Sequence, residues 1–130
     1  MKLKYCLIIN HSPYNNQKSY IAFQFATALI NCGHYINSIF LYQDGVCNIA
    51  NITLPNDEIN LFNKWQILLN KYKVPMYVCI NSIERRGIIQ NIKNNLKISL
   101  YNGYHKFGFK ITGLIDLAKS IAKSDRCIQF

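Results

Sequence analysis

The sequence predicts an α/β fold, a single-domain three-layer sandwich in which helices cover both faces of a mainly parallel five-stranded sheet. Apolar runs rich in β-forming residues alternate with segments whose apolar residues recur every three or four positions, which is typical of alternating strands and helices. Turn-forming residues separate these segments. The 130 residues suit one domain with its own core and show no internal repeat or linker, so residues 1–130 are expected to form one domain.

The first half of the chain predicts a strand, a helix and a second strand. Residues 3–10, LKYCLIIN, form a mostly apolar run typical of a strand buried on both faces. Residues 18–33 have helical apolar spacing, with Ser19 as the candidate N-cap and Gly33 as the stop. Residues 35–42, YINSIFLY, predict the second strand, and the QDGVCNIANITLPN stretch that follows is expected to be a loop.

The second half begins with a helix predicted over residues 57–73, with Asn56 or Asp57 as its candidate N-cap. Pro75 ends this helix and opens a third strand over residues 76–81. One face of the helix carries the apolar residues Ile59, Phe62, Trp65, Leu68 and Leu69. The remaining segments predict a short helix or turn over 82–92, a loop with a little helix over 94–106, a short strand over 107–113, a helix over 113–123 and a closing strand over 125–130.

The composition is basic, with a formal net charge of +9 at pH 7. Such a balance is compatible with a nucleic-acid partner or an acidic protein partner. The lysines are scattered rather than clustered, and the abundance of Lys, Asn and Ile is equally typical of an AT-biased genome. No apolar run reaches the roughly 18 residues that a membrane helix needs. The apolar run at the N-terminus is short and no cleavage site follows it, so it is interpreted as a strand and the protein is expected in the cytoplasm.

The feature most suggestive of chemistry is Cys79, in the stretch VPMYVCINSIERRGII, where a predicted strand ends. If a helix starts directly after the strand, the thiol lies near its first free N–H groups, which favour a thiolate. Arg85 and Arg86 would add positive charge. A thiolate is the form that attacks sulfur, so this placement suits a nucleophile. The alternative is that Cys79 packs as a small buried hydrophobe.

The other cysteines fit the packing alternative better. The total of five is odd and no C-x-x-C pair occurs, so reduced thiols are expected rather than a disulfide framework or a zinc ribbon. Cys47 is the exception, because its loop could approach the same sheet edge as Cys79. His11 follows the first strand and is either an acid or base near Cys79 or an exposed loop histidine. The remaining cysteines are Cys6, Cys32 and Cys127. The sequence shows neither a metal-ligand spacing nor a glycine-rich phosphate loop.

Five stretches carry a resemblance to a known family: SYIAFQFATALINCGHYINSIFLYQDGVCNIAN, the helix around NKWQ, VCINSIERRGI, GFKITGL and the closing DRCIQF. They cover nearly the whole length in order and with similar spacing. On these stretches the chain resembles the DsrE-like sulfurtransferase family, and within it the D-type subunits of bacterial sulfur-relay complexes. The segment from Gln90 to Lys106 contributes little to the resemblance.

The resemblance implies a specific role. In such proteins a cysteine shortly before Arg-Arg-Gly accepts a sulfane sulfur as a persulfide, and the matching residue here is Cys79. Sulfur arrives from an upstream carrier protein and leaves to a downstream carrier, ending as 2-thiouridine at the wobble position of certain tRNAs. The implied partners are homologous B and C subunits, forming a heterotrimer that pairs into a heterohexamer. No metal or organic cofactor is implied, and direct tRNA contact is left open.

Two other functions are compatible with the sequence. The chain could be a structural subunit of the same kind of complex, holding the active site of a partner. It could also be a flavodoxin-like module that binds a nucleotide or a flavin. Loss of sulfur transfer in an intact complex after Cys79→Ser would distinguish the enzyme from the structural subunit, and a yellow colour on purification would favour the flavin-binding module.

Overall fold

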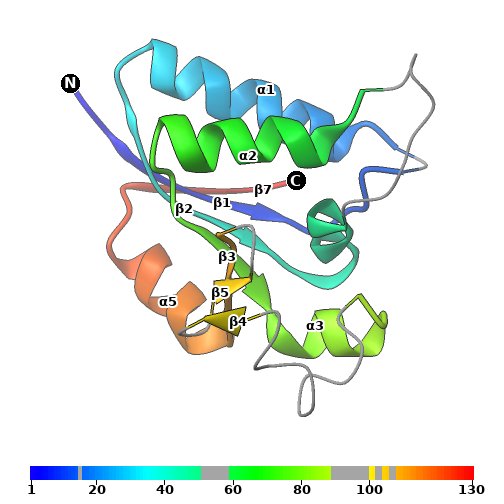
Figure 1. The fold of residues 1–130 in the computed structure, drawn as a ribbon. Coiled ribbons are helices and arrows are strands. Elements are labelled where there is room, and N and C mark those ends of the chain that lie inside the picture. Colours follow the sequence, from blue (N-terminus) through cyan, green and yellow to red (C-terminus); the bar gives the residue numbers. More distant parts are fainter. Residues whose placement is uncertain (15, 51–58, 89–99, 102–103, 106–107) are drawn as a thin grey trace.

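The computed structural model describes residues 1–14, 16–50, 59–88, 100–101, 104–105 and 108–130, which build one sheet with helices on both faces (Figure 1). Its strand order is β4-β5-β6-β3-β2-β1-β7. Five of these strands are mutually parallel, and they are the five that the sequence predicts. They are β1 (Lys4–Ile9), β2 (Tyr35–Leu41), β3 (Met76–Cys79), β6 (Lys110–Thr112) and β7 (Arg126–Gln129).

The two remaining strands were not expected. β4 (Leu100–Tyr101) and β5 (Tyr104–His105) pair antiparallel, and β5 pairs antiparallel with β6, whereas the sequence predicted a loop with a little helix there. Two-residue strands are too short to show a period of two. The sequence did carry a local signal, because Asn-Gly stands between them and is the dipeptide most typical of tight hairpins.

The helices lie in two layers, as predicted. α1 (Lys18–Asn31) and α2 (Leu61–Lys71) lie side by side on one face of the sheet, while α3 (Ile80–Arg85) and α5 (Leu114–Ala122) lie on the other (Figure 1). The predicted loop after β2 instead holds a short 3-10 helix, η1 (Gln43–Ile49). None of the helices in the described ranges has the length and apolar character needed to cross a membrane.

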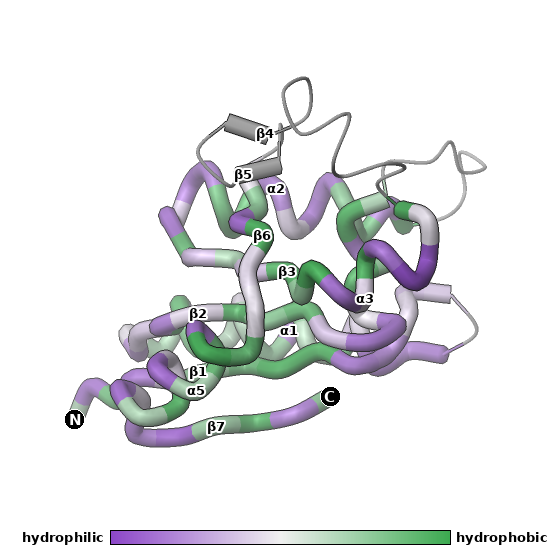
Figure 2. The backbone as a smooth tube through the Cα atoms, turned by 90° about the horizontal axis from the view of Figure 1, so that it is seen from below, coloured by the Kyte–Doolittle hydropathy of each residue, from purple (hydrophilic) through white to green (hydrophobic). Residues whose placement is uncertain are grey.

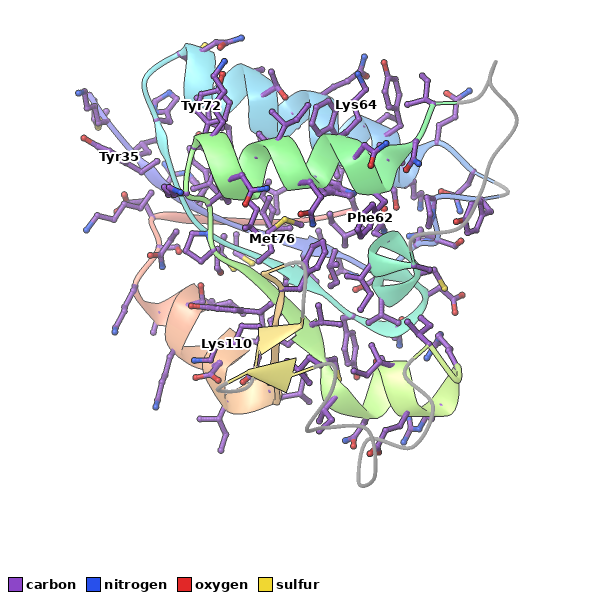
Figure 3. All side chains as sticks on the ribbon, viewed as in Figure 1. Tyr35, Phe62, Lys64, Tyr72, Met76 and Lys110 are labelled. Carbon is purple, nitrogen blue, oxygen red and sulfur yellow. The ribbon has the colours of Figure 1, made fainter. Side chains whose placement is uncertain are left out.

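The main core lies between the sheet and the α1–α2 layer. Figure 2 shows hydrophobic colour along β1 and β3 and hydrophilic colour at the end of α3. Phe62 and Met76 point into the space between α2 and the sheet, and Lys64 lies on the outer surface of that layer (Figure 3). Alternate strand residues supply the sheet side of this core, namely Leu7, Ile9, Ile39, Leu41, Met76 and Val78.

The helix ends differ in part from the sequence predictions. The N-cap of α1 is Gln17, and Ser19 is instead buried inside the first turn. Gly33 has a φ of +79° just after α1, as expected for a residue that stops a helix. α2 begins later than predicted, because the side chain of Asn60 caps it by accepting a hydrogen bond from the backbone N–H of Asn63.

Two further predictions concern the surroundings of α2. The predicted caps Asn56 and Asp57 lie outside the described residues. Ile59 was placed on the apolar face of the helix, but it lies before the first turn and is exposed. Trp65 and Leu68 are buried as predicted.

Candidate functional site

Cys79 is the last residue of β3 and the N-cap of α3, so the helix starts directly after the thiol. The predicted strand over 76–81 therefore ends two residues early, because Ile80 is already helical. The backbone at Cys79 is extended and its side chain makes no capping hydrogen bond. Only 3% of Cys79 is exposed. The start of α3 directly after the strand agrees with the sequence prediction of a helix beginning there.

The thiol belongs to the sheet face opposite the main core. Val78 is part of the core beneath α1 and α2, and alternation along β3 directs Cys79 to the α3–α5 side. Thr112 of β6 is the direct partner of Cys79 in the parallel ladder, so the two side chains share a face. The Thr112 hydroxyl donates a hydrogen bond to the Asp116 carboxylate in the first turn of α5. A polar pair therefore borders the thiol position on one side.

The 3-10 helix η1 is fastened to α3. The backbone N–H of Gln43 donates to the Ser82 hydroxyl over 3.0 Å. Arg86 donates from Nε to Asp44 over 2.8 Å, forms an ion pair with it through Nη2, and also donates to the Ser82 carbonyl. The structure gives Arg86 an ion-pair partner in η1. Arg86 thus joins η1 to α3.

Arg85 differs from its neighbour. It lies in the last turn of α3 and is exposed. No ion pair joins it to another residue in the described part of the chain. Its positive charge is therefore the more available of the two for a ligand or partner.

A buried polar network supports η1 from the α1–α2 side. The Trp65 indole N–H donates to the Asn48 side-chain oxygen over 2.9 Å, and the Asn48 amide donates to the Ser19 hydroxyl and the Gly45 carbonyl. Ser19 in turn donates to the His11 carbonyl over 2.6 Å. The network therefore connects the loop after β1 to the loop after β2. The sequence placed Trp65 in the core correctly, but Asn48 in an irregular loop gave no signal of its role.

Gly45 is required by a close approach of the backbone. A Cβ at this position would lie 1.8 Å from the carbonyl oxygen of Ile9 and 2.6 Å from its carbonyl carbon. Both atoms belong to the main chain at the end of β1, so neither can swing aside as a side chain can. The sequence predicted a loop here, and the structure shows that the glycine lets η1 pack against β1.

His11 and His34 both take part in hydrogen bonds within the fold. His11 is half-buried; its carbonyl joins the network above, while its side-chain Nδ1 is buried without a hydrogen-bond partner in the described part of the structure. The predicted acid–base role of His11 beside Cys79 stays a prediction. His34 is half-buried, accepts a hydrogen bond from the Leu3 N–H and packs edge-on against Tyr5.

The remaining cysteines depart from the packing prediction in two cases. Cys6 is fully buried, as expected, but Cys32 and Cys127 are exposed. Cys32 follows the last turn of α1, and Cys127 lies on β7, which among the described strands pairs with β1 alone. Cys47 is half-buried in η1, and its approach to Cys79 stays a prediction.

The environment of Cys47 works against its ionisation. Burial and the nearby Asp44 carboxylate raise the pKa of the Cys47 thiol, and the charge of Arg86 and a hydrogen bond with Ser12 oppose that rise without cancelling it. Cys47 is therefore mostly a thiol at neutral pH and a weak nucleophile.

The comparisons with known proteins agree with this architecture. A sequence profile described as the DsrE/DsrF-like family matches residues 3–130. The chain belongs to the DsrE/DsrF-like family. Among its relatives, "Sulfurtransferase TusD" from Buchnera aphidicola of Schizaphis graminum is 42% identical over 130 residues, covering 98% of this chain and all of the relative.

Other DsrE/DsrF-like relatives give the same picture. "Sulfurtransferase TusD" from Buchnera aphidicola of Acyrthosiphon pisum (strain 5A) is 41% identical over 129 residues, with 98% of this chain and 100% of the relative covered. "Sulfurtransferase TusD homolog" from Vibrio vulnificus (strain YJ016) is 39% identical, with 98% of each chain covered. The crystal structure of the ychN protein from E. coli superposes with a TM-score of 0.78 over the full length of both chains at 23% identity, which shows a shared fold.

Proposed function

We propose that this chain is a sulfurtransferase subunit of a sulfur relay and that Cys79 accepts a sulfane sulfur as a persulfide. The observation that carries the proposal is the position of Cys79, at the end of β3 and directly before α3, in a DsrE/DsrF-like chain whose full-length relatives are named sulfurtransferase TusD. A thiol at that place is adjacent to the start of a helix, and the first N–H groups of a helix favour a nearby anion.

The proposed reaction consists of two sulfur exchanges. The Cys79 thiolate attacks the outer sulfur of a donor persulfide, a new S–S bond forms on Cys79, and the donor cysteine leaves as a thiolate. The thiolate of a carrier cysteine then attacks the outer sulfur on Cys79, and the Cys79 thiolate leaves in its original state. Sulfane sulfur is passed on with no net oxidation or reduction. The proton of each persulfide or thiol is exchanged with solvent.

The low exposure of Cys79 favours transfer between docked proteins. A thiol that is 3% exposed meets small free thiols rarely, so a persulfide held there is protected from loss to solvent. A partner cysteine reaches the Cys79 thiol only when the partner docks beside α3 and η1, where β3 and β2 end. Arg85, exposed at the end of α3, is suited to contact an anionic partner or persulfide there.

The proposed partners follow the relatives named TusD. We place the chain among homologous B and C subunits in a heterotrimer that pairs into a heterohexamer, in the cytoplasm, between an upstream and a downstream sulfur carrier. The final acceptor is the wobble uridine of tRNA, which becomes 2-thiouridine. The net charge of +9 would permit contact with tRNA but does not require it.

The exposed face of α5 supports the assembly part of the proposal. Leu114, Ile115 and Ile121 are 52%, 74% and 39% exposed, and their spacing places them along one side of the helix. Ala118 and Ala122 on the same side are exposed as well. An apolar helix face of this kind is typical of a protein contact rather than of a free surface. We assign it to a homologous subunit.

Peptide mass mapping tests the central claim. The purified protein is incubated with a persulfide donor and digested without reductant, and the cysteine-containing peptides are compared. We expect the added mass of one sulfur atom on the Cys79 peptide, reversed by dithiothreitol and absent in Cys79→Ser. Cys32→Ser is the matched control, because Cys32 is exposed and distant from β3, and it should accept sulfur at Cys79 normally.

The same experiment separates the enzyme from a structural subunit. If Cys79 stays unmodified in the folded protein bound to its partners, the chain is a scaffold and the persulfide proposal is wrong. If Cys79→Ser assembles normally but the complex no longer transfers sulfur, the thiol is the acceptor.

A further inference from the structure

A pair of cysteines lies on β1 and β7, the last two strands at one edge of the sheet. Cys6 of β1 and Cys127 of β7 are direct Cα partners in the parallel ladder. In the strand order, β2 and β1 separate β3 from β7, so this pair is remote from Cys79. Cys6 is fully buried, whereas Cys127 is exposed.

The register brings the two thiols within bonding reach. Neighbouring strands lie about 4.8 Å apart, and directly paired residues of parallel strands project from the same face. Disulfides join residues whose Cα atoms are about 4.4–6.8 Å apart. Burial raises the pKa of the Cys127 thiol, and the nearby Cys6 and a hydrogen bond with its thiol raise that pKa further.

The surroundings of Cys6 tolerate its oxidation. Its sulfur lies 3.6 Å from the Ser38 hydroxyl, which is also hydrogen-bonded to the Ser120 hydroxyl of α5. If Cys6 loses its proton to a disulfide, Ser38 keeps Ser120 as a partner. The change therefore leaves no buried polar group unpaired, which would otherwise oppose it.

We propose that Cys6 and Cys127 form a reversible disulfide that ties the edge strand β7 to β1 when the protein meets a low-molecular-weight disulfide such as oxidised glutathione. The exposed Cys127 thiolate attacks first, forming a mixed disulfide and releasing one glutathione thiolate. The Cys6 thiolate then attacks the Cys127 sulfur, the Cys6–Cys127 bond forms, and the second glutathione leaves as a thiolate. Two protein thiols are oxidised and one small disulfide is reduced.

The bond would change the edge strand in two ways. β7 is attached to β1 by the strand ladder and by backbone hydrogen bonds at its two ends. The Phe130 N–H donates to the Ile8 carbonyl, and the Asp125 N–H donates to the Lys4 carbonyl. A covalent link in the middle of this ladder opposes fraying of β7. It also removes the exposed Cys127 thiol from reaction with other sulfur compounds.

The test is oxidation of the native full chain with oxidised glutathione at mildly alkaline pH, followed by non-reducing peptide mapping and a thermal melt. We expect a peptide pair linked through Cys6 and Cys127, the loss of two free thiols, and a higher unfolding midpoint that dithiothreitol returns to its starting value. Cys127→Ser should abolish both the link and the shift. Cys32→Ser, at an exposed cysteine outside the pair, should retain both.

Several outcomes would overturn the inference. A stable mixed disulfide of glutathione on Cys127 with Cys6 still free would show that the second attack does not occur in the folded protein. A link between Cys127 and any other cysteine would show that the reaction follows unfolding, and circular dichroism of the oxidised sample checks that the fold is intact. No link over the full range of glutathione redox ratios would equally refute it.

Discussion

Asn48 is the residue whose replacement most directly tests how the candidate site is held together. It is 1% exposed, accepts the Trp65 indole N–H and donates to Ser19 and Gly45. Asn48→Ala removes three hydrogen bonds worth about 1 kcal/mol each, and it leaves a buried indole N–H without its acceptor. We expect the free energy of unfolding to fall by about 3–4 kcal/mol, which lowers the thermal midpoint by roughly 11–15 °C.

Urea unfolding followed by fluorescence provides the assay, because the sequence contains a single tryptophan, Trp65, which reports on its own hydrogen bond. Asn70→Ala is the matched control, since Asn70 is exposed on α2, and we expect it to change the free energy of unfolding by less than about 0.5 kcal/mol. A double-mutant cycle with Trp65→Phe, followed by circular dichroism, isolates the indole bond.

Two results would refute the reasoning about Asn48. One is a loss below about 1 kcal/mol with an unchanged denaturant slope, which would mean that the network is not coupled to stability. The other is a full loss from Asn48→Ala in the Trp65→Phe background, which would show that the indole N–H contributes nothing to the effect. If the network does hold η1, persulfide formation at Cys79 should also slow in Asn48→Ala.

Three further predictions concern the same region. Gly45→Ala forces a Cβ to 1.8 Å from the Ile9 carbonyl oxygen, so it should lower the free energy of unfolding by more than about 3 kcal/mol, and near-normal urea unfolding would contradict the close approach. Arg86→Ala removes the ion pair with the exposed Asp44 and should cost about 1 kcal/mol or less, with a difference from wild type that narrows in high salt. Because the pKa of Cys47 is raised, its alkylation should reach half its maximal rate at a higher pH in the folded protein than in urea, and Asp44→Asn should move that midpoint downward; no difference between folded and unfolded protein would refute the assignment.

The five parallel strands and the two helix layers could be predicted from the sequence because runs and spacings of apolar residues are local in the chain. The run LKYCLIIN and the helical spacing of residues 18–33 are examples of such local information. The order of the strands in the sheet is not local. It places β7, the last strand in the chain, beside β1, the first. Because β1 and β7 are neighbours, Cys6 and Cys127 are paired in the ladder. The two residues lie near opposite ends of the chain, so the sequence does not reveal this pairing.

The elements that the sequence missed are short or irregular. η1 begins at a positive-φ residue, Gln43, and has no apolar period that would distinguish a 3-10 helix from a loop. β4 and β5 are two residues each, and only the Asn-Gly between them gave a signal. Serine is a preferred N-cap residue, but the Ser19 hydroxyl instead donates a hydrogen bond to the His11 carbonyl in the buried network. The tertiary contact therefore overrides the local preference.

The sequence by itself determined the α/β class, the positions of the parallel strands and the thiol at the end of the third one, because these depend on residue types and their spacing within a few turns of chain. Only the tertiary structure decided what surrounds that thiol. It paired Arg86 with Asp44 and joined Trp65 to Asn48. Each of these contacts joins segments brought together by the packing of loops and strands, and hydrogen bonds and ion pairs between distant residues leave no periodic trace in the chain.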